Sequence, residues 1–186
     1  EVQIYRRQFE GRRIAGRSIA PHTLQIAALW AVLTRLEPPT HPNLSLLQKA
    51  RLYDGGAVQG FGPEHEAEMR GAAAREGLEG ISPRYVQDRI ATCMVDDKPC
   101  VGARDVLDAI ARGLAHHSLV SNEDTRRRYL ELVDVAREEY EERIKAEVQE
   151  AIAPLPDETD EAFAHRVRLR FAEALGKELT NVVPPF

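Results

Sequence analysis

Arg84 is the residue whose type and position in this sequence point most directly to chemistry. It follows Ser82 and Pro83, which favour the cap and the first position of a helix, so Arg84 falls in the first turn. The helix dipole disfavours a cation there by about 0.3–1 kcal/mol, but an arginine beside free backbone N–H groups can hold an anion. The residues alone leave two interpretations open: a phosphate-binding arginine, or a structural ion pair with Asp88 or Glu79.

The same segment contains the residues that would hold Arg84 in place. Ile81 precedes the predicted cap and can pack against Val86 as a hydrophobic staple. We therefore predict that Ile81, Ser82 and Pro83 support the start of this helix. A fixed helix start holds the base of the Arg84 side chain at one point, which favours precise binding of an anion.

Four other side chains, Cys93, Cys100, His116 and His117, could suggest a zinc site. Their spacing fits no familiar zinc pattern, and adjacent histidines on a helix point about 100° apart, so we predict no metal site. Cys93 is instead expected in the core, and the histidines at a helix C-terminus. Two cysteines are too few for a disulfide scaffold, which fits a reducing compartment, and the cytoplasm is the expected location.

No catalytic residue is predicted. The four glutamates between residues 138 and 142 lie on a predicted exposed helix, where they should titrate normally and form a solvated face. The sequence has no G-x-x-x-x-G-K-[ST] loop, because its Gly176-Lys177 pair is followed by Glu. It also has no G-x-G-x-x-G, H-R-D, D-F-G or G-x-S-x-G element. We therefore expect this chain to catalyse nothing alone.

The composition excludes several classes of partner. A formal net charge of −5 argues against a dedicated nucleic-acid binder, and no apolar run is long enough to span a membrane. With 43% hydrophobic and 30% charged residues the chain should fold, and Ala, Leu, Arg and Glu favour helices. Because it opens at Glu1 without an initiator Met, we expect it to be a fragment of a longer protein.

The apolar spacing predicts an all-α, multi-helix domain of about seven helices, with no sheet beyond a stray bridge. A nearly all-apolar helix starts with Pro21 in its first turn and places Trp30 in the core. We divide the chain into a lid-like helical region (1–100), a region with a long charged helix (101–153), and a C-terminal amphipathic helix with a tail (154–186).

The long helix is predicted to run from a near capping box at Ser121 and Asp124 to about Ile152, and to project from the domain. Its length would be about 45 Å. The pairs Glu139/Arg143 and Glu141/Lys145 at i,i+4 should support its solvated face. Beyond Pro154 and Pro156, Asp157 or Thr159 can cap a short final helix.

Four separated segments, in order, resemble the PrkA family, bacterial proteins described as AAA+ serine protein kinases. The run GISPRYV from Gly80 looks like the G-x-S-P-R element of an AAA+ lid. The other three are IAPHTLQIAALWAVLTRLE from Ile19, KARLYDG from Lys49, and GLAHHSLVSNEDTRRRYLELVDVAREEYEERIKAEVQ from Gly113. The resemblance covers about residues 2–152, and its specificity lies in the order of the four segments.

The resemblance implies that Arg84 is the sensor 2 arginine, which reaches from the lid to the nucleotide phosphates. The phosphate loop and Walker B acid would lie N-terminal to Glu1, in an AAA+ core that this chain lacks. The intact protein would then bind ATP and Mg and phosphorylate a protein substrate, and could form a homo-oligomer. This chain would be its lid and C-terminal regulatory region, inactive in isolation and with no bound cofactor.

Two other functions remain open at this point. One is a helical interaction or adaptor domain whose long arm, residues 122–152, binds a partner or a second copy. The other is the lid of an AAA+ ATP-dependent protease or chaperone-like motor. A phosphate-binding loop upstream of Glu1 would favour the kinase and the protease over the adaptor.

Overall fold

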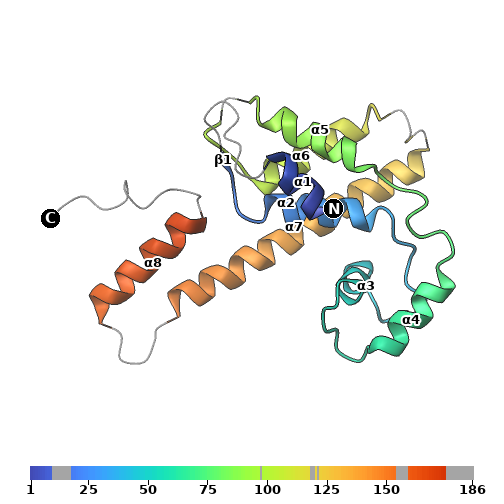
Figure 1. The fold of residues 1–186 in the computed structure, drawn as a ribbon, viewed down its shortest axis with the longest axis horizontal. Coiled ribbons are helices and arrows are strands. Elements are labelled where there is room, and N and C mark those ends of the chain that lie inside the picture. Colours follow the sequence, from blue (N-terminus) through green and yellow to red (C-terminus); the bar gives the residue numbers. More distant parts are fainter. Residues whose placement is uncertain (10–17, 97, 118–119, 121, 154–158, 175–186) are drawn as a thin grey trace.

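The computed structural model describes residues 1–9, 18–96, 98–117, 120, 122–153 and 159–174 (Figure 1). The predicted all-α, multi-helix fold is confirmed, with eight helices in these ranges instead of about seven. They are α1 (Val2–Phe9), α2 (Thr23–Leu33), α3 (Leu46–Tyr53), α4 (Pro63–Ala72), α5 (Pro83–Cys93), α6 (Ala103–Leu114), α7 (Glu123–Ile152) and α8 (Asp160–Ala174). The sheet content slightly exceeds the prediction. Besides an isolated bridge between Val58 and Phe61, β1 (Ser18–Ile19) pairs in parallel with β2 (Cys100–Val101).

Helix α2 lies at the centre of the hydrophobic core, as its nearly all-apolar sequence predicts. Trp30 is fully buried, and its indole N–H donates to the backbone carbonyl of Tyr129 in α7 at 3.1 Å. Burying an indole N–H without a partner would be costly, so this hydrogen bond lets the large ring sit in the core. It also connects α2 to α7, although the two residues are 99 positions apart in the sequence.

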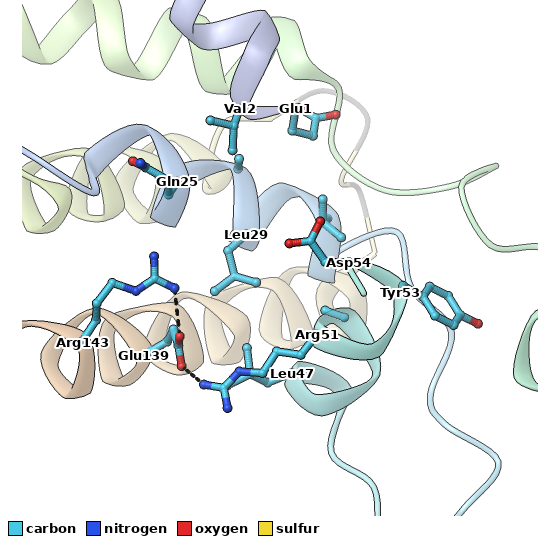
Figure 2. Close-up of a pocket in the computed structure, with 13 residues that line it drawn as sticks. Glu1, Val2, Gln25, Leu29, Leu47, Arg51, Tyr53, Asp54, Glu139 and Arg143 are labelled. Carbon is cyan, nitrogen blue, oxygen red and sulfur yellow. Dashed lines mark hydrogen bonds and ion pairs between the residues drawn. The ribbon is translucent and has the colours of Figure 1, made fainter. Parts of the chain in front are cut away.

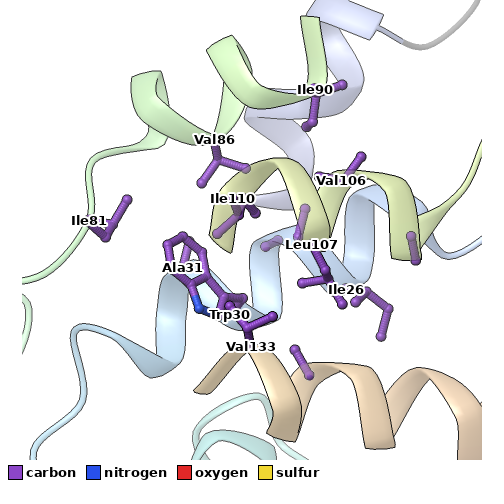
Figure 3. Close-up of a cluster of buried hydrophobic side chains, with 14 of the residues drawn as sticks. Ile26, Trp30, Ala31, Ile81, Val86, Ile90, Val106, Leu107, Ile110 and Val133 are labelled. Carbon is purple, nitrogen blue, oxygen red and sulfur yellow. The ribbon is translucent and has the colours of Figure 1, made fainter. Parts of the chain in front are cut away.

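Helices α5, α6 and α7 pack around α2 (Figure 3). On α5, Val86 and Ile90 face α6, while Leu107 and Ile110 of α6 lie between α5 and α2 (Figure 3). These side chains are spaced three or four residues apart, which places them on one face of each helix. The core therefore fixes α5 and α6 side by side.

Helix α2 begins later than predicted. Pro21 was expected in its first turn, but the helix starts at Thr23, and Pro21 comes before the N-cap residue His22. His22 adopts a left-handed conformation with φ of 63°, which turns the chain from β1 into α2. The hydroxyl of Thr23 then donates to the backbone carbonyl of Val101 in β2 at 3.4 Å.

A second, smaller cluster joins α3 to α4 and is formed by Leu44, Leu52 and Met69. On α3, the Lys49 side chain is 1% exposed and forms an ion pair with Glu76. The pair connects α3 to the segment that precedes α5. Removing either partner would leave an uncompensated buried charge, which is strongly destabilising. Burial, together with a hydrogen bond to Glu76, raises the pKa of Tyr53 to about 12.

The long helix α7 has a buried half and an exposed half. Tyr129, Leu132, Val133 and Ala136 are buried against the core, whereas beyond Tyr140 only Ala151 is buried among the described residues of the helix. In Figure 1 this distal half projects from the core toward α8. The predicted projection is therefore confirmed.

The ends and ion pairs of α7 follow the prediction only in part. Asn122 caps the helix by accepting from the Asp124 N–H at 2.9 Å, while Ser121 lies outside the described residues. The predicted Glu139–Arg143 pair forms at 3.1 Å. The predicted Glu141–Lys145 pair is wrong. Glu141 instead pairs at 2.8 Å with Arg104 of α6, and Lys145 approaches Glu142 at 3.5 Å.

The final helix α8 is capped at Thr159, whose hydroxyl accepts from the Ala162 N–H at 3.3 Å, while Asp157 lies outside the described residues. Arg166 of α8 donates to the carbonyls of Ala151 and Ala153 at 2.7 and 2.8 Å. A guanidinium at the C-terminus of α7 satisfies free carbonyls and complements the helix dipole. This contact joins α8 to the tip of the projecting helix.

We expect the distal half of α7 to exchange its amide protons faster than α2. Between Tyr140 and Ala151 it buries no side chain and contacts the core through polar side chains at the surface, such as Glu147 with His22 at 2.7 Å, and such contacts stabilise little. Hydrogen exchange measured by mass spectrometry should therefore give lower protection near Lys145 than near Ile26. Equal protection at the two positions would show that the arm is held as firmly as the core.

Candidate functional site

The start of α5 is built as the sequence predicts. Ser82 is the N-cap and its hydroxyl accepts from the Tyr85 N–H at 3.4 Å, while Pro83 occupies the first helical position. Ile81 and Val86 are both buried in the main core cluster, where the predicted staple needs them. These contacts fix the turn of helix that carries Arg84.

Side chains at the end of α2 also position this helix start, through the backbone of Ile81. The Ile81 N–H donates to the Thr34 hydroxyl at 3.1 Å. The Ile81 carbonyl accepts from the Arg35 guanidinium through Nε at 3.0 Å and Nη2 at 2.5 Å. Arg35 is itself paired with the Glu1 carboxylate. Both polar groups of the Ile81 backbone are therefore satisfied by one short segment.

Gly80 makes this close approach possible. Its φ is +112°, a conformation that residues with a Cβ rarely adopt. A Cβ at this position would lie 2.6 Å from Cγ of Arg35 and 2.9 Å from the carbonyl oxygen of Thr34. The glycine is therefore required both by the backbone conformation and by contact with the α2 terminus. Sequence reasoning found the glycine but not Thr34 or Arg35, which lie 45 or more residues away.

Arg84 is exposed, and no hydrogen bond or ion pair joins its side chain to another residue in the described part of the chain. The structural ion pair that the sequence left open is absent. Glu79 pairs with Arg75 instead, and Asp88 forms no ion pair with Arg84 although it lies one turn further along α5. The guanidinium is therefore available to a ligand.

A hollow of about 630 Å³ lies beside Arg84, between α5 and α6. Besides the Tyr85 phenol, the titratable side chains that line it are basic or imidazole groups with a single carboxylate: Arg84, Arg89, Arg112, His116, His117 and Asp88. Three guanidinium groups against one carboxylate make the hollow electropositive in a chain of net charge −5. An anion is the ligand that such a hollow favours. We call it the α5–α6 pocket.

Arg89 enters the pocket between an aromatic ring and a glycine. Its guanidinium lies over the Tyr85 ring, 5.4 Å from the centroid, and Tyr85 donates to the carbonyl of Ile110 at 2.8 Å. A Cβ on Gly113 would lie 3.1 Å from both Cδ and Nη1 of Arg89 and 2.5 Å from the Tyr85 hydroxyl. Because Gly113 has no side chain, Arg89 and Tyr85 can pack closely against α6.

The imidazole of His117 packs edge-on against Tyr85, with 4.7 Å between ring centroids. Burial, and then the nearby Arg89 cation, lower the pKa of His117 below its ordinary value. Both effects favour the neutral form of the imidazole. The fixed positive charge of the pocket comes from its arginines.

Sequence reasoning found Arg84 but missed Arg89 and Arg112. The available signal was the antiparallel placement of two consecutive helices, which brings the last turn of α6 beside the first turns of α5.

Among the described residues, no three His, Cys, Asp or Glu side chains gather closely enough to hold a metal ion. No described helix has the length and apolar character needed to cross a membrane.

A second hollow, of about 400 Å³, lies where α1, α2, α3 and α7 meet (Figure 2). Both of its guanidinium groups are already paired, because the Glu139 carboxylate accepts from Arg51 and from Arg143 (Figure 2). The walls are otherwise largely apolar, with Leu29 and Leu47 facing inward. This hollow offers no unpaired guanidinium to an anion, which leaves the α5–α6 pocket as the candidate site.

Residues 47–167, which contain the whole α5–α6 pocket, match the family described as the PrkA serine protein kinase C-terminal domain. The chain belongs to this family. The PrkA resemblance seen in the sequence is therefore confirmed.

Named relatives of this PrkA domain extend well beyond it. The protein named ATP-dependent protease PrkA of Bacillus subtilis is 39% identical over 152 residues, which cover 81% of this chain and 24% of the relative. The protein named serine/threonine kinase YeaG of Escherichia coli K12 is 31% identical over 88 residues, 46% of this chain and 13% of the relative. The chain thus spans about a quarter or less of these relatives. No solved structure matches it.

We predict that Gly80→Ala destabilises the PrkA domain more than Gly77→Ala. Both glycines have positive φ, +112° and +80°, and an alanine in such a conformation costs about 1–2 kcal/mol. Only at Gly80 would the new Cβ also collide with the end of α2, whereas Gly77 has open space. Urea unfolding of the two variants should show the difference, and equal destabilisation would mean that the Gly80 contact is unimportant.

Proposed function

We propose that this domain is the lid and C-terminal regulatory region of an ATP-dependent serine protein kinase. In the intact protein, Arg84 would act as a sensor 2 residue and contact the phosphates of ATP bound with Mg in an AAA+ core. The observation that carries the proposal is an exposed, unpaired arginine held at a fixed helix start beside an electropositive pocket. Membership of the PrkA family and the kinase name of one relative support it.

The contact would depend on charge and position together. A guanidinium bound to a phosphate oxygen forms a charge-assisted hydrogen bond, about twice as strong as a neutral one. Here the backbone of Ile81 is clamped to α2, so the helix turn that carries Arg84 is already fixed, and only the arginine side chain itself would lose freedom when the nucleotide arrives. An arginine placed in this way could report whether the terminal phosphate is present.

We expect the 186-residue chain to show neither ATP hydrolysis nor protein phosphorylation by itself. The sequence has no phosphate-cradling loop, and phosphoryl transfer relies on such a loop together with metal ions for charge stabilisation. The measurement is release of labelled phosphate and transfer to a general protein substrate, with the intact protein as positive control. Turnover that co-purifies with the chain through successive columns would contradict the assignment.

In the intact protein, Arg84→Ala should lower nucleotide affinity or ATP turnover by about ten- to more than a hundredfold. This range corresponds to losing about 1.5–3 kcal/mol from a hydrogen bond to a charged group. Arg75→Ala is the matched control, because Arg75 is also exposed but pairs with Glu79 outside the pocket. If Arg84→Ala melts like the wild type and both quantities stay within a factor of two, Arg84 is only a surface arginine.

A second function has a specific observation in its favour, because the Bacillus subtilis relative is named an ATP-dependent protease. In a protease the lid and Arg84 would play the same nucleotide-sensing part, so the pocket does not separate the two activities. Radiolabelled phosphate transfer and substrate cleavage, assayed in parallel on the intact protein, would distinguish them. The adaptor function is the third candidate. In it, the exposed arm of α7 would bind a partner protein or a second copy of this chain.

A further inference from the structure

We propose that the α5–α6 pocket is a self-contained polyphosphate site, in which Arg89 and Arg112 bind the same ligand as Arg84. The inference deepens the proposed function by naming two further phosphate-binding residues. It also goes beyond that function, because the pocket would bind a polyphosphate without the rest of the protein.

The first argument is the absence of carboxylate partners. No ion pair joins Arg84, Arg89 or Arg112 to an acidic side chain within the described part of the chain. Arginines elsewhere in the same structure form such pairs regularly, including Arg51 with Glu139 and Arg137 with Asp108. Acidic residues outnumber basic ones, 30 to 25, so three unpaired arginines around one hollow are contrary to the general pattern.

The second argument is that two helices supply the cations. Arg84 lies in the first turn of α5, Arg89 in its middle, and Arg112 in the last turn of α6. The three therefore line the hollow from different directions. Several separated positive groups suit a chain of linked phosphates better than a single small anion. This arrangement favours a di- or triphosphate over orthophosphate.

The third argument concerns Arg89. Its Nε is buried and has no hydrogen-bond acceptor among the described residues, while Gly113 leaves room for the guanidinium against α6. A buried donor without an acceptor is unfavourable, and native structures usually satisfy such groups. The phosphate oxygens of a ligand in the pocket would supply the acceptor nearby.

Asp88 provides a test in which a substitution should strengthen binding instead of weakening it. It is the one carboxylate that lines the pocket, it is exposed, and it would repel a polyphosphate. Replacing it with an uncharged side chain should therefore strengthen binding. A purely structural role of the surrounding arginines would not produce that gain.

The experiment is isothermal titration of inorganic tripolyphosphate into the 186-residue chain, without Mg, at low salt. We expect wild type to bind, Arg89→Gln and Arg112→Gln each to weaken binding about tenfold, and Asp88→Asn to tighten it. Arg104→Gln is the matched control, because Arg104 lies on α6 outside the pocket and pairs with Glu141. Orthophosphate should bind more weakly than tripolyphosphate.

Arg112 and Asp88 are exposed, so their variants should fold even if Arg89→Gln does not. The proposal is overturned if wild type does not bind, or if Arg112→Gln binds like Arg104→Gln and Asp88→Asn gives no gain. The proposed lid function has a separate test, the ATP response of Arg84→Ala in the intact protein. If Arg84→Ala impairs the ATP response of the intact protein but the 186-residue chain binds no tripolyphosphate, the lid function stands and the self-contained site is refuted.

Discussion

The attachment of Ile81 to the end of α2 is the interaction on which the site depends. Both polar groups of its backbone are bound by Thr34 and Arg35, and Gly80 allows the two segments to approach this closely. Because α2 is the centre of the core, a helix start fixed to α2 has a fixed position relative to the whole domain. The position of the helix turn that carries Arg84 thus follows from hydrogen bonds made to the backbone of Ile81.

The pocket also depends on how the core orients α5 and α6. Val86 and Ile90 face Leu107 and Ile110, which holds the two helices side by side and places the last turn of α6 beside the first turn of α5. The small residue Gly113 then leaves space for Arg89 and Tyr85. An apolar interface therefore positions a set of like charges that would otherwise repel one another.

Local signals in the sequence were enough for the helices and for one site residue. The Ser82-Pro83 cap, the apolar helix around Trp30 and the long charged helix all follow from neighbouring residues, and the structure contains all three, although α2 begins at Thr23 and not at Pro21. Arg112 could not be found in this way, because it becomes a neighbour of Arg84 only after α6 folds back on α5. Arg89 lies on α5 itself, but its place against α6 depends on the distant Gly113. Local signals also missed Arg104. Its pair with Glu141 joins α6 to α7 and takes the place of the expected pair between Glu141 and Lys145.

The hydrogen bond from Trp30 to the Tyr129 carbonyl has a practical consequence. Trp30 is the single tryptophan of the chain, and its ring is shielded from water between α2 and α7. Its fluorescence emission would therefore report on the packing of the proximal half of α7 against α2. A red-shifted emission with unchanged helical ellipticity would reveal detachment of the arm while its helix stays intact, and would separate these two events without any added label.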